Sequence, residues 1–407
     1  MIRLMTRILL LLLLKSSQAA SNPKVKTLSG WIEGTYKLSE PGENKFAAYE
    51  GIPFAVAPIE RLRFQPPMKH TNFHPPSEPL KAVQPPPECP QLDLATGDFK
   101  GSEDCLYLNV FTPSLETMGD QRLPVMVWIH GGAFQFGSAS SEQYGPERLL
   151  DKEVVMVSLN YRLGPLGFLT SGDKEAPPNV GILDQQMALR WVRDHISAFG
   201  GDPERVTIFG ESAGGVSVMA HLASPYSSGL FHAAIAMSGV WGEMPFLHKS
   251  KSPATYAVRL AEKLGCETTD TATMVTCLRS KSSKDLLTQA ATFRTFAFLP
   301  EPFTPVVDDF MEHPVLPQPL HNVWEDNLPS VPLIIGGNQH EGIAQLLEFI
   351  KDPTKLAKLN ENFDTEGPAL LLGVDPEVLL LLSSLSCSYF RLIPGPEMKE
   401  RQLQLKY

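Results

Sequence analysis

A serine between two glycines is the group in this sequence with the clearest capacity for chemistry. Ser212 lies in residues 210–214 (Gly-Glu-Ser-Ala-Gly), which follow a mainly apolar run at residues 205–209 (Arg-Val-Thr-Ile-Phe). A Gly-x-Ser-x-Gly turn from a strand into a helix lifts the serine hydroxyl out of a sheet, where it can act as a nucleophile. The pattern therefore predicts that Ser212 is a nucleophile. The alternative is a tight packing turn with an idle serine.

A glycine-rich turn elsewhere in the chain could complete such a site. Residues 130–134 (His-Gly-Gly-Ala-Phe) directly follow a continuous apolar run. A turn of this kind can direct successive backbone N–H groups at one point, as an oxyanion requires. Together with the N–H of Ala213, those of Gly132 and Ala133 would form an oxyanion hole. Alone, the segment could be an ordinary glycine turn.

Composition limits the classes of protein to which the chain can belong. Its 407 residues, 43% hydrophobic and 20% charged, describe a soluble globular protein with a large core. The formal net charge of −10 and the lack of a basic block argue against a nucleic-acid partner. Because there is no internal repeat and no clear linker, a single domain is the better interpretation.

The first residues have the layout of a secretory signal peptide. Arg3 and Arg7 flank the start of an apolar run at residues 8–14, and Ser17-Gln18-Ala19 offers small residues for cleavage. A membrane anchor is the alternative, but the run is far shorter than the roughly 20 residues of a spanning helix. We expect a signal peptide over residues 1–20, a secreted, extracellular or ER-lumenal protein, and no membrane span.

Secretion makes the cysteines candidates for disulfides. Of the five, Cys89 and Cys105 flank one short segment, and Cys266 and Cys277 flank another. Local pairing within each couple is the simplest connectivity, and it leaves Cys387 over.

Strands and helices alternate along the chain. Residues 123–130 and 154–159 are continuous apolar runs, typical of strands covered on both faces, and residues 184–199 have helical spacing. Further strands are expected at residues 206–209, 231–237 and 331–335, a helix at 213–222, and an opening antiparallel hairpin within 30–51. This alternation predicts a mainly parallel sheet with helices on both faces.

Several segments together resemble a known family. These are residues 103–109 (Glu-Asp-Cys-Leu-Tyr-Leu-Asn), 160–164 (Asn-Tyr-Arg-Leu-Gly), 199–203 (Phe-Gly-Gly-Asp-Pro) and 209–215. The chain resembles the type-B carboxylesterases, the family that includes the cholinesterases, from about Gly30 to about Phe349. The resemblance implies an α/β-hydrolase fold, with a central mostly parallel sheet flanked by helices. It also implies hydrolysis of carboxylic esters through an acyl-enzyme, with no cofactor and no metal.

The resemblance also assigns residues. Ser212 matches the nucleophile of a Ser-Glu-His triad, and Glu341, within residues 337–342 (Gly-Asn-Gln-His-Glu-Gly), matches the acid. A solvated loop glutamate is the alternative for Glu341. Ala133 stands where many members have a third glycine, and it keeps the N–H. The two local cysteine pairings match the family's two small disulfide loops.

A substrate class follows from the same comparison. The segment between Cys89 and Cys105 contains no tryptophan, whereas the cholinesterases place a choline-stacking tryptophan on this loop. A cation–π site for choline is therefore unsupported. We expect small-molecule carboxylic esters with uncharged acyl groups as substrates.

The general base of the triad has no counterpart after the acid. In this fold the order is serine, acid, histidine. The histidines are His70, His74, His130, His195, His221, His232, His248, His313, His321 and His340, and none follows Glu341. His340 adjoins the acid, His221 lies about 13 Å along a helix from Ser212, and His130 belongs to the glycine turn. We expect none of them to substitute.

The end of the chain accounts for the missing histidine. From about Gly367 the resemblance stops, so we expect an incomplete hydrolase domain at residues 21–365, without its C-terminal strand or strands, and a divergent tail at 366–407. A truncated isoform or an aberrant gene model would produce this arrangement. Loss of a triad member predicts impaired turnover, and loss of a strand predicts an unpaired sheet edge beyond residues 331–335.

Two other functions compete with ester hydrolysis. The chain could be a non-catalytic secreted binding protein of adhesion type, or a truncated isoform without function. Retention of Ser212, Glu341 and the glycine turn favours the hydrolase.

Overall fold

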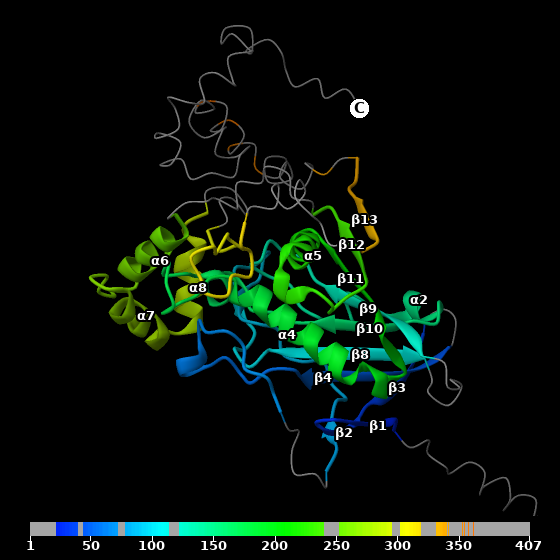
Figure 1. Cartoon of the computed structure of the whole chain (residues 1–407). Coiled ribbons are helices and arrows are strands. Elements are labelled where there is room, and N and C mark those ends of the chain that lie inside the picture. Colours follow the sequence, from blue (N-terminus) through cyan, green and yellow to red (C-terminus); the bar gives the residue numbers. More distant parts are fainter. Residues whose placement is uncertain are drawn as a thin grey trace, which may run out of the picture.

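The computed structural model describes residues 22–39, 44–71, 78–113, 122–239, 252–294, 302–318 and 331–339, together with positions 341, 352, 354, 357 and 361 (Figure 1). The predicted signal peptide at 1–20, the predicted tail at 366–407 and His340 lie outside the described residues.

An eight-stranded sheet organises the molecule, with strand order β13-β12-β11-β9-β10-β8-β4-β3. Its strands are β3 (Thr35–Leu38), β4 (Lys45–Pro53), β8 (Tyr107–Pro113), β9 (Leu123–Ile129), β10 (Val155–Leu159), β11 (Gly201–Glu211), β12 (Ala233–Met237) and β13 (Leu333–Gly336). The five strands from β13 to β10 run parallel, and β8, β4 and β3 are antiparallel. The predicted mainly parallel sheet is therefore present, and β3 and β4 form a hairpin where one was expected.

Helices and two small sheets surround the large sheet. The helices are α2 (Glu147–Leu150), α3 (Gly164–Phe168), α4 (Val180–His195), α5 (Ala213–Ala223), α6 (Ser252–Lys263), α7 (Thr271–Ser280) and α8 (Ser283–Ala291), with 3-10 turns η1 (Glu60–Leu62), η2 (Ile196–Phe199) and η3 (Pro225–Ser227). The small sheets join β1 (Lys24–Thr27), β2 (Gly30–Glu33) and β5 (Leu80–Lys81), and β6 (Gln91–Leu92) with β7 (Phe99–Lys100). Helices α6, α7 and α8 form a group at the end of the molecule away from β13 (Figure 1).

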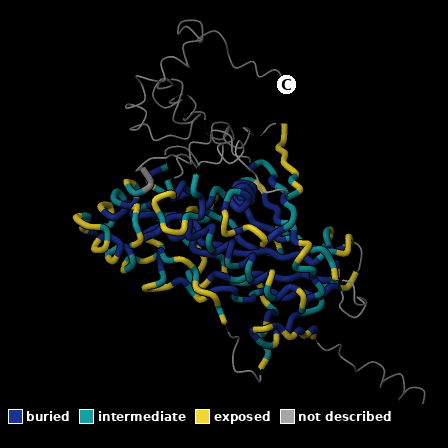
Figure 2. Tube along the Cα trace, in the orientation of Figure 1, coloured by how far each residue is buried: buried dark blue, intermediate teal, exposed yellow. Residues whose placement is uncertain are grey.

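Both faces of the central strands are covered by side chains. Along β9, Val127 and Ile129 belong to the main core, whereas Trp128 belongs to a second cluster on the other face. Every residue of β10 is buried, and the strands at the centre of the sheet are the buried interior in Figure 2. This arrangement explains why these strands are continuous apolar runs in the sequence.

The largest differences in extent from the sequence prediction are at α4 and β11. Helix α4 begins at Val180 rather than at residue 184, and it ends at His195. The 3-10 turn η2 continues the helical path to Phe199, and Gly200, with a φ of 82°, terminates it. Strand β11 begins at Gly201 rather than at Val206, with a shift in register between the two. The polar residues in this stretch concealed the first part of the strand.

The disulfides Cys89–Cys105 and Cys266–Cys277 are both present. Within the described ranges, no helix combines the length and the apolar character that crossing a bilayer requires.

Candidate active site

The carboxyl ends of four parallel strands bring the candidate residues to one edge of the sheet. Gly210 of β11 lies beside Ile129 of β9 and Ala236 of β12, and Met237 lies beside Gly336 of β13. The glycine turn, Ser212 and Glu341 are attached to the ends of these strands. The chain passes from β9 to β10 on one side and then to β11 on the other. Such a switch point is where open α/β sheets bind ligands.

Ser212 sits on a strained turn between β11 and α5. Its φ of 55° and ψ of −123° lie in a region that residues with a side chain rarely adopt. Its N–H donates to the Met237 carbonyl at 2.9 Å. A Cβ atom on Gly214 would collide with the Ile129 carbonyl oxygen, and one on Gly239 would collide with the Ser212 carbonyl oxygen. The elbow geometry expected from the sequence is therefore present, and glycines on both sides make room for it.

The glycine turn lies directly against this elbow. A Cβ atom on Gly131 would stand 2.6 Å from the Glu211 carbonyl oxygen and 3.2 Å from Ser212 Cβ. Gly132 has a φ of 105° and Ala133 one of 54°, so the backbone turns sharply beside the serine.

The N–H groups expected to bind an oxyanion are available. Across the described residues, those of Gly132 and Ala133 donate to no protein acceptor. Ala213 is the first residue of α5, so its N–H has no acceptor within the helix. Free donors next to a serine hydroxyl are what an acyl-transfer site needs.

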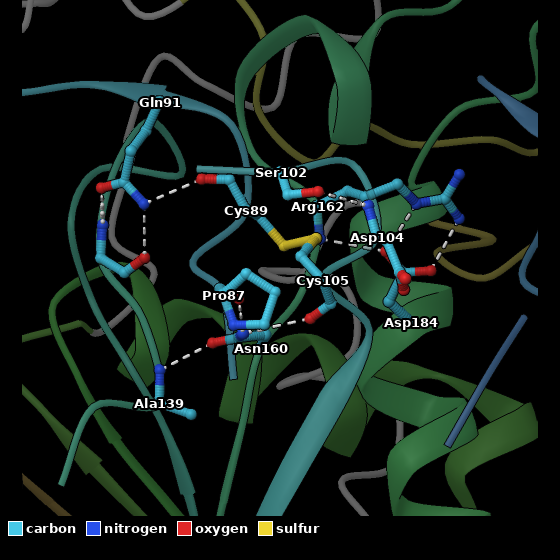
Figure 3. The surroundings of a disulfide bond; sticks show 11 residues. Pro87, Cys89, Gln91, Ser102, Asp104, Cys105, Ala139, Asn160, Arg162 and Asp184 are labelled. Atoms are coloured by element: carbon cyan, nitrogen blue, oxygen red, sulfur yellow. Dashed lines mark hydrogen bonds and ion pairs between the residues drawn. A yellow bond between two sulfur atoms is a disulfide. The ribbon is translucent and has the colours of Figure 1, made fainter. Parts of the chain in front are cut away.

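The Cys89–Cys105 disulfide region holds the segment that follows the glycine turn (Figure 3). Gln91 accepts from the Gly137 N–H at 2.9 Å, and its Nε2 lies 3.0 Å from the carbonyl oxygens of Gly137 and Cys89. The side-chain amide of Gln91 therefore connects the disulfide loop to Gly137, three residues after the turn.

Asn160 makes a second connection between the disulfide region and the segment after the glycine turn. Its Oδ1 accepts from the Ala139 N–H at 2.7 Å, and its Nδ2 donates to the carbonyl oxygens of Pro87 and Cys105 (Figure 3). Sequence analysis assigned no role to Gln91 or Asn160, although Asn160 opens one of the segments that carry the family resemblance.

Glu341 is brought to the same edge by hydrogen bonds. Its Oε1 accepts from the Ser238 hydroxyl at 2.6 Å and from the Asn338 N–H at 2.5 Å. These two hydrogen bonds, of which the one from Ser238 has the larger effect, hold the pKa of Glu341 below its ordinary value. Burial, and then the negative charge of Glu341, raise the pKa of Glu211. Sequence analysis missed Ser238, whose only signal was its position directly after an apolar strand.

His130, the first residue of the glycine turn, is buried. Its Nδ1 lies 2.8 Å from the Gly131 carbonyl oxygen, and its ring stacks on Tyr161 with 4.4 Å between centroids. Burial lowers the pKa of His130 to about 4, so the ring is neutral at physiological pH. Its contacts are those of a packed structural residue.

His221 is the centre of a buried network on α5. Its Nδ1 lies 2.9 Å from Ser227 Oγ and its Nε2 lies 3.0 Å from Gln185 Oε1. Gln185 also donates to Ser217 Oγ, which in turn donates to the Ala213 carbonyl. The network fixes the first turn of α5, and sequence analysis missed it.

No described histidine reaches Ser212. Burial lowers the pKa of His221 to about 3, and both of its ring nitrogens are occupied within its network. Among the residues the structure describes, no histidine is hydrogen-bonded to the Ser212 hydroxyl.

Comparison with known proteins agrees with this arrangement. The model of the carboxylesterase family matches residues 21–371. Venom carboxylesterase-6 of Apis mellifera is 39% identical over 355 residues, which are 86% of this chain and 62% of that protein. A carboxylic ester hydrolase of Bombus ignitus is 40% identical over 365 residues (88% and 63%), and liver carboxylesterase B-1 of Rattus norvegicus is 38% identical over 393 residues (88% and 67%).

The chain thus spans less than two thirds of the length of the first two of these relatives. The family match covers most of the chain, and the relatives align with more than four fifths of it. Together with the parallel sheet and the strained serine turn at its edge, these matches show that the chain belongs to the carboxylesterase family and has its α/β-hydrolase fold.

Proposed function

We propose that the chain is a serine hydrolase of carboxylic esters that works through an acyl-enzyme on Ser212. The observation that carries this proposal is the contact between two segments far apart in the sequence. The turn at Gly131 lies against a serine held at positive φ, and free N–H groups flank it. The carboxylesterase names of the relatives support the same reaction.

Each group at the sheet edge has a role in this reaction. Ser212 Oγ attacks the ester carbonyl carbon, and its proton passes through a base to the departing alcohol. The carbonyl oxygen becomes an oxyanion, which the N–H groups of Gly132, Ala133 and Ala213 stabilise. The positive end of the α5 dipole assists them. Water then hydrolyses the acyl-serine by the reverse sequence of steps.

Glu341 is proposed as the triad acid that orients the base. Its charged form is favoured by Ser238 and Asn338, which suits a carboxylate paired with an imidazole. Among the described residues, no histidine is hydrogen-bonded to Ser212. We therefore propose that these residues by themselves form the acyl-enzyme slowly, because a triad without its histidine loses on the order of 10⁴-fold or more in turnover.

Esters with uncharged acyl and alcohol groups are the proposed substrates, since the loop closed by Cys89 and Cys105 lacks a tryptophan for choline. A secreted or ER-lumenal location is proposed alongside, because disulfides form in oxidising compartments. Among the described residues, Ser212 has no histidine partner, which favours a second candidate, a secreted binding protein without catalysis.

Hydrolysis of p-nitrophenyl butyrate by the full chain tests the proposal. We expect slow turnover that rises on the order of tenfold with added imidazole, a base that is present but not positioned. After subtraction of the rate of imidazole and ester without protein, Ser212→Ala should remove both the basal and the rescued rate, and Ser228→Ala, an exposed serine, should change neither. Equal rates for Ser212→Ala and the unaltered chain would rule out the hydrolase and leave the binding protein.

A further inference from the structure

A surface cavity lies on α4, lined by none of the residues at the candidate active site. It has a volume of about 250 Å³. Leu183, Met187 and Arg190 follow one another on one face of α4 and form part of its wall with Pro67. Since a water molecule takes about 30 Å³, the cavity has room for a ligand of roughly eight non-hydrogen atoms.

The cation at this cavity has no anionic partner among the described residues. Arg190 Nη2 donates to Gln186 Oε1 at 3.1 Å, and no carboxylate of the described ranges pairs with it. Arg193, almost one turn further along α4, is bonded to Asp194 at 3.1 Å, and Lys69 holds the same carboxylate at 2.8 Å. A guanidinium carries five N–H donors in a planar fork, so Arg190 retains donors for a planar anion.

Gln186 holds Arg190 in place. Its side chain is buried, and its Nε2 donates to Ser227 Oγ at 3.2 Å. Ser227 also belongs to the buried network around His221. The acceptor of Arg190 is therefore fixed from behind. A pre-oriented guanidinium loses less side-chain entropy on binding than a free one.

The other wall of the cavity is aromatic and polar. Tyr226 and His313 line it, with the Tyr226 hydroxyl 3.0 Å from His313 Nδ1 and the two rings edge to face at 6.0 Å. No acidic side chain is among the lining residues. The cavity thus joins apolar surface from Leu183 and Met187 to Arg190, a cation that pairs with no carboxylate of the described residues.

We propose that this cavity binds a small monocarboxylate with an apolar tail. The carboxylate takes the free donors of Arg190 in a bidentate pair, and the tail lies on Leu183, Met187 and Pro67. Ester hydrolysis also releases a carboxylic acid, so the cavity could bind the acid product of the proposed reaction through the same contacts. Binding here does not depend on that reaction.

Calorimetric titration of the full chain with hexanoate, and with the neutral isostere hexanamide, tests the proposal. We expect hexanoate to bind more tightly than hexanamide, and Arg190→Gln to weaken hexanoate by about tenfold while leaving hexanamide unchanged. Arg193→Gln is the matched control on the same helix, and it should leave both ligands unaffected. Met187→Ala should weaken both alike, because it removes only apolar surface.

Three results would each overturn the proposal. These are equal affinity for hexanoate and hexanamide, hexanoate binding that survives Arg190→Gln undiminished, and an equal loss in Arg193→Gln. Inorganic sulfate that binds more tightly than hexanoate would also overturn it, because the cavity would then select charge rather than a carboxylate with a tail.

Discussion

The backbone at Ser212 is the feature that most strongly links structure to reactivity. A φ of 55° on a residue with a Cβ atom is unfavourable, and the surroundings hold it there through the bond to Met237 and the glycines that pack against the turn. Strain of this kind costs about 1–3 kcal/mol and persists where it serves a site. The hydroxyl and the Cβ atom of Ser212 should therefore have separable effects on reactivity and on stability.

Two substitutions at this position test the strain. Ser212→Ala and Ser212→Gly both remove the hydroxyl, so both should abolish reaction with esters. Only glycine relieves the positive φ, so we expect its free energy of unfolding to exceed that of the alanine variant by about 1 kcal/mol. Urea denaturation of the two variants measures the difference. A glycine variant less stable than the alanine variant would show that this backbone is not strained.

His221 predicts an effect of pH on stability. Burial lowers its pKa from the ordinary 6.5 to about 3. Below pH 6.5 the unfolded chain therefore takes up a proton that the folded chain refuses. Stability is fully present above that pH and falls by about 1.4 kcal/mol per pH unit as the solution becomes more acid. From pH 6.5 to 5 the loss from this residue is about 2 kcal/mol.

His221→Gln removes that proton uptake. The variant should be less stable at pH 7, because the buried network loses contacts, but its unfolding free energy should fall less steeply between pH 6.5 and 5. His232→Gln, at a partly exposed histidine, is the comparison variant for the loss of a histidine as such. An unchanged slope in His221→Gln would contradict the assignment of a neutral, buried imidazole.

At the scale of elements, the site depends on how closely the glycine turn after β9 approaches the elbow after β11. Gly131 has ordinary backbone angles, so its lack of a side chain matters only for space. A Cβ atom there would press on Glu211 and Ser212, and the turn and the elbow would have to separate. Donors and nucleophile would then lose their common geometry.

Gly131→Ala should therefore destabilise the fold by about 1–3 kcal/mol and slow reaction at Ser212. Gly336→Ala is the comparison variant, because Gly336 is the last residue of the parallel strand β13 but has open space around its Cβ position. We expect that variant to stay within about 0.5 kcal/mol of the unaltered chain. Equal effects of the two alanines on stability and on reaction rate would contradict the close approach.

Local sequence patterns predicted those parts of the fold and of the site that a short run of residues determines. The elbow, the glycine turn and the central strands could be predicted because each is encoded in consecutive residues. Ser238, Gln91 and Asn160 could not, because their roles depend on hydrogen bonds between segments far apart in the sequence. The early start of β11 was hidden for a different reason, since polar residues and a proline precede its apolar part.

At the scale of the whole molecule, one edge of the sheet carries the candidate active site, and the outer strand β13 has exposed apolar side chains. The carboxyl ends of β9, β11, β12 and β13 collect the candidate residues. Across the described residues, β13 is paired on one side only and is mostly exposed (Figure 2). The side chain of Ile334 in this strand is 65% exposed. Helix α4 connects two further features, since its buried face holds the network beneath α5 and its outer face carries the Arg190 cavity.

Labelling with a fluorophosphonate tests most directly whether Ser212 is a nucleophile at an ester-hydrolase site. The full chain is incubated with the probe, with and without imidazole, and the modified peptide is identified by mass spectrometry. We predict slow labelling on Ser212 that imidazole accelerates and Ser212→Ala abolishes. Labelling elsewhere in the chain, or labelling that persists in Ser212→Ala, would contradict the assignment of Ser212. Rapid labelling without imidazole would contradict the proposal that the described residues place no base beside Ser212.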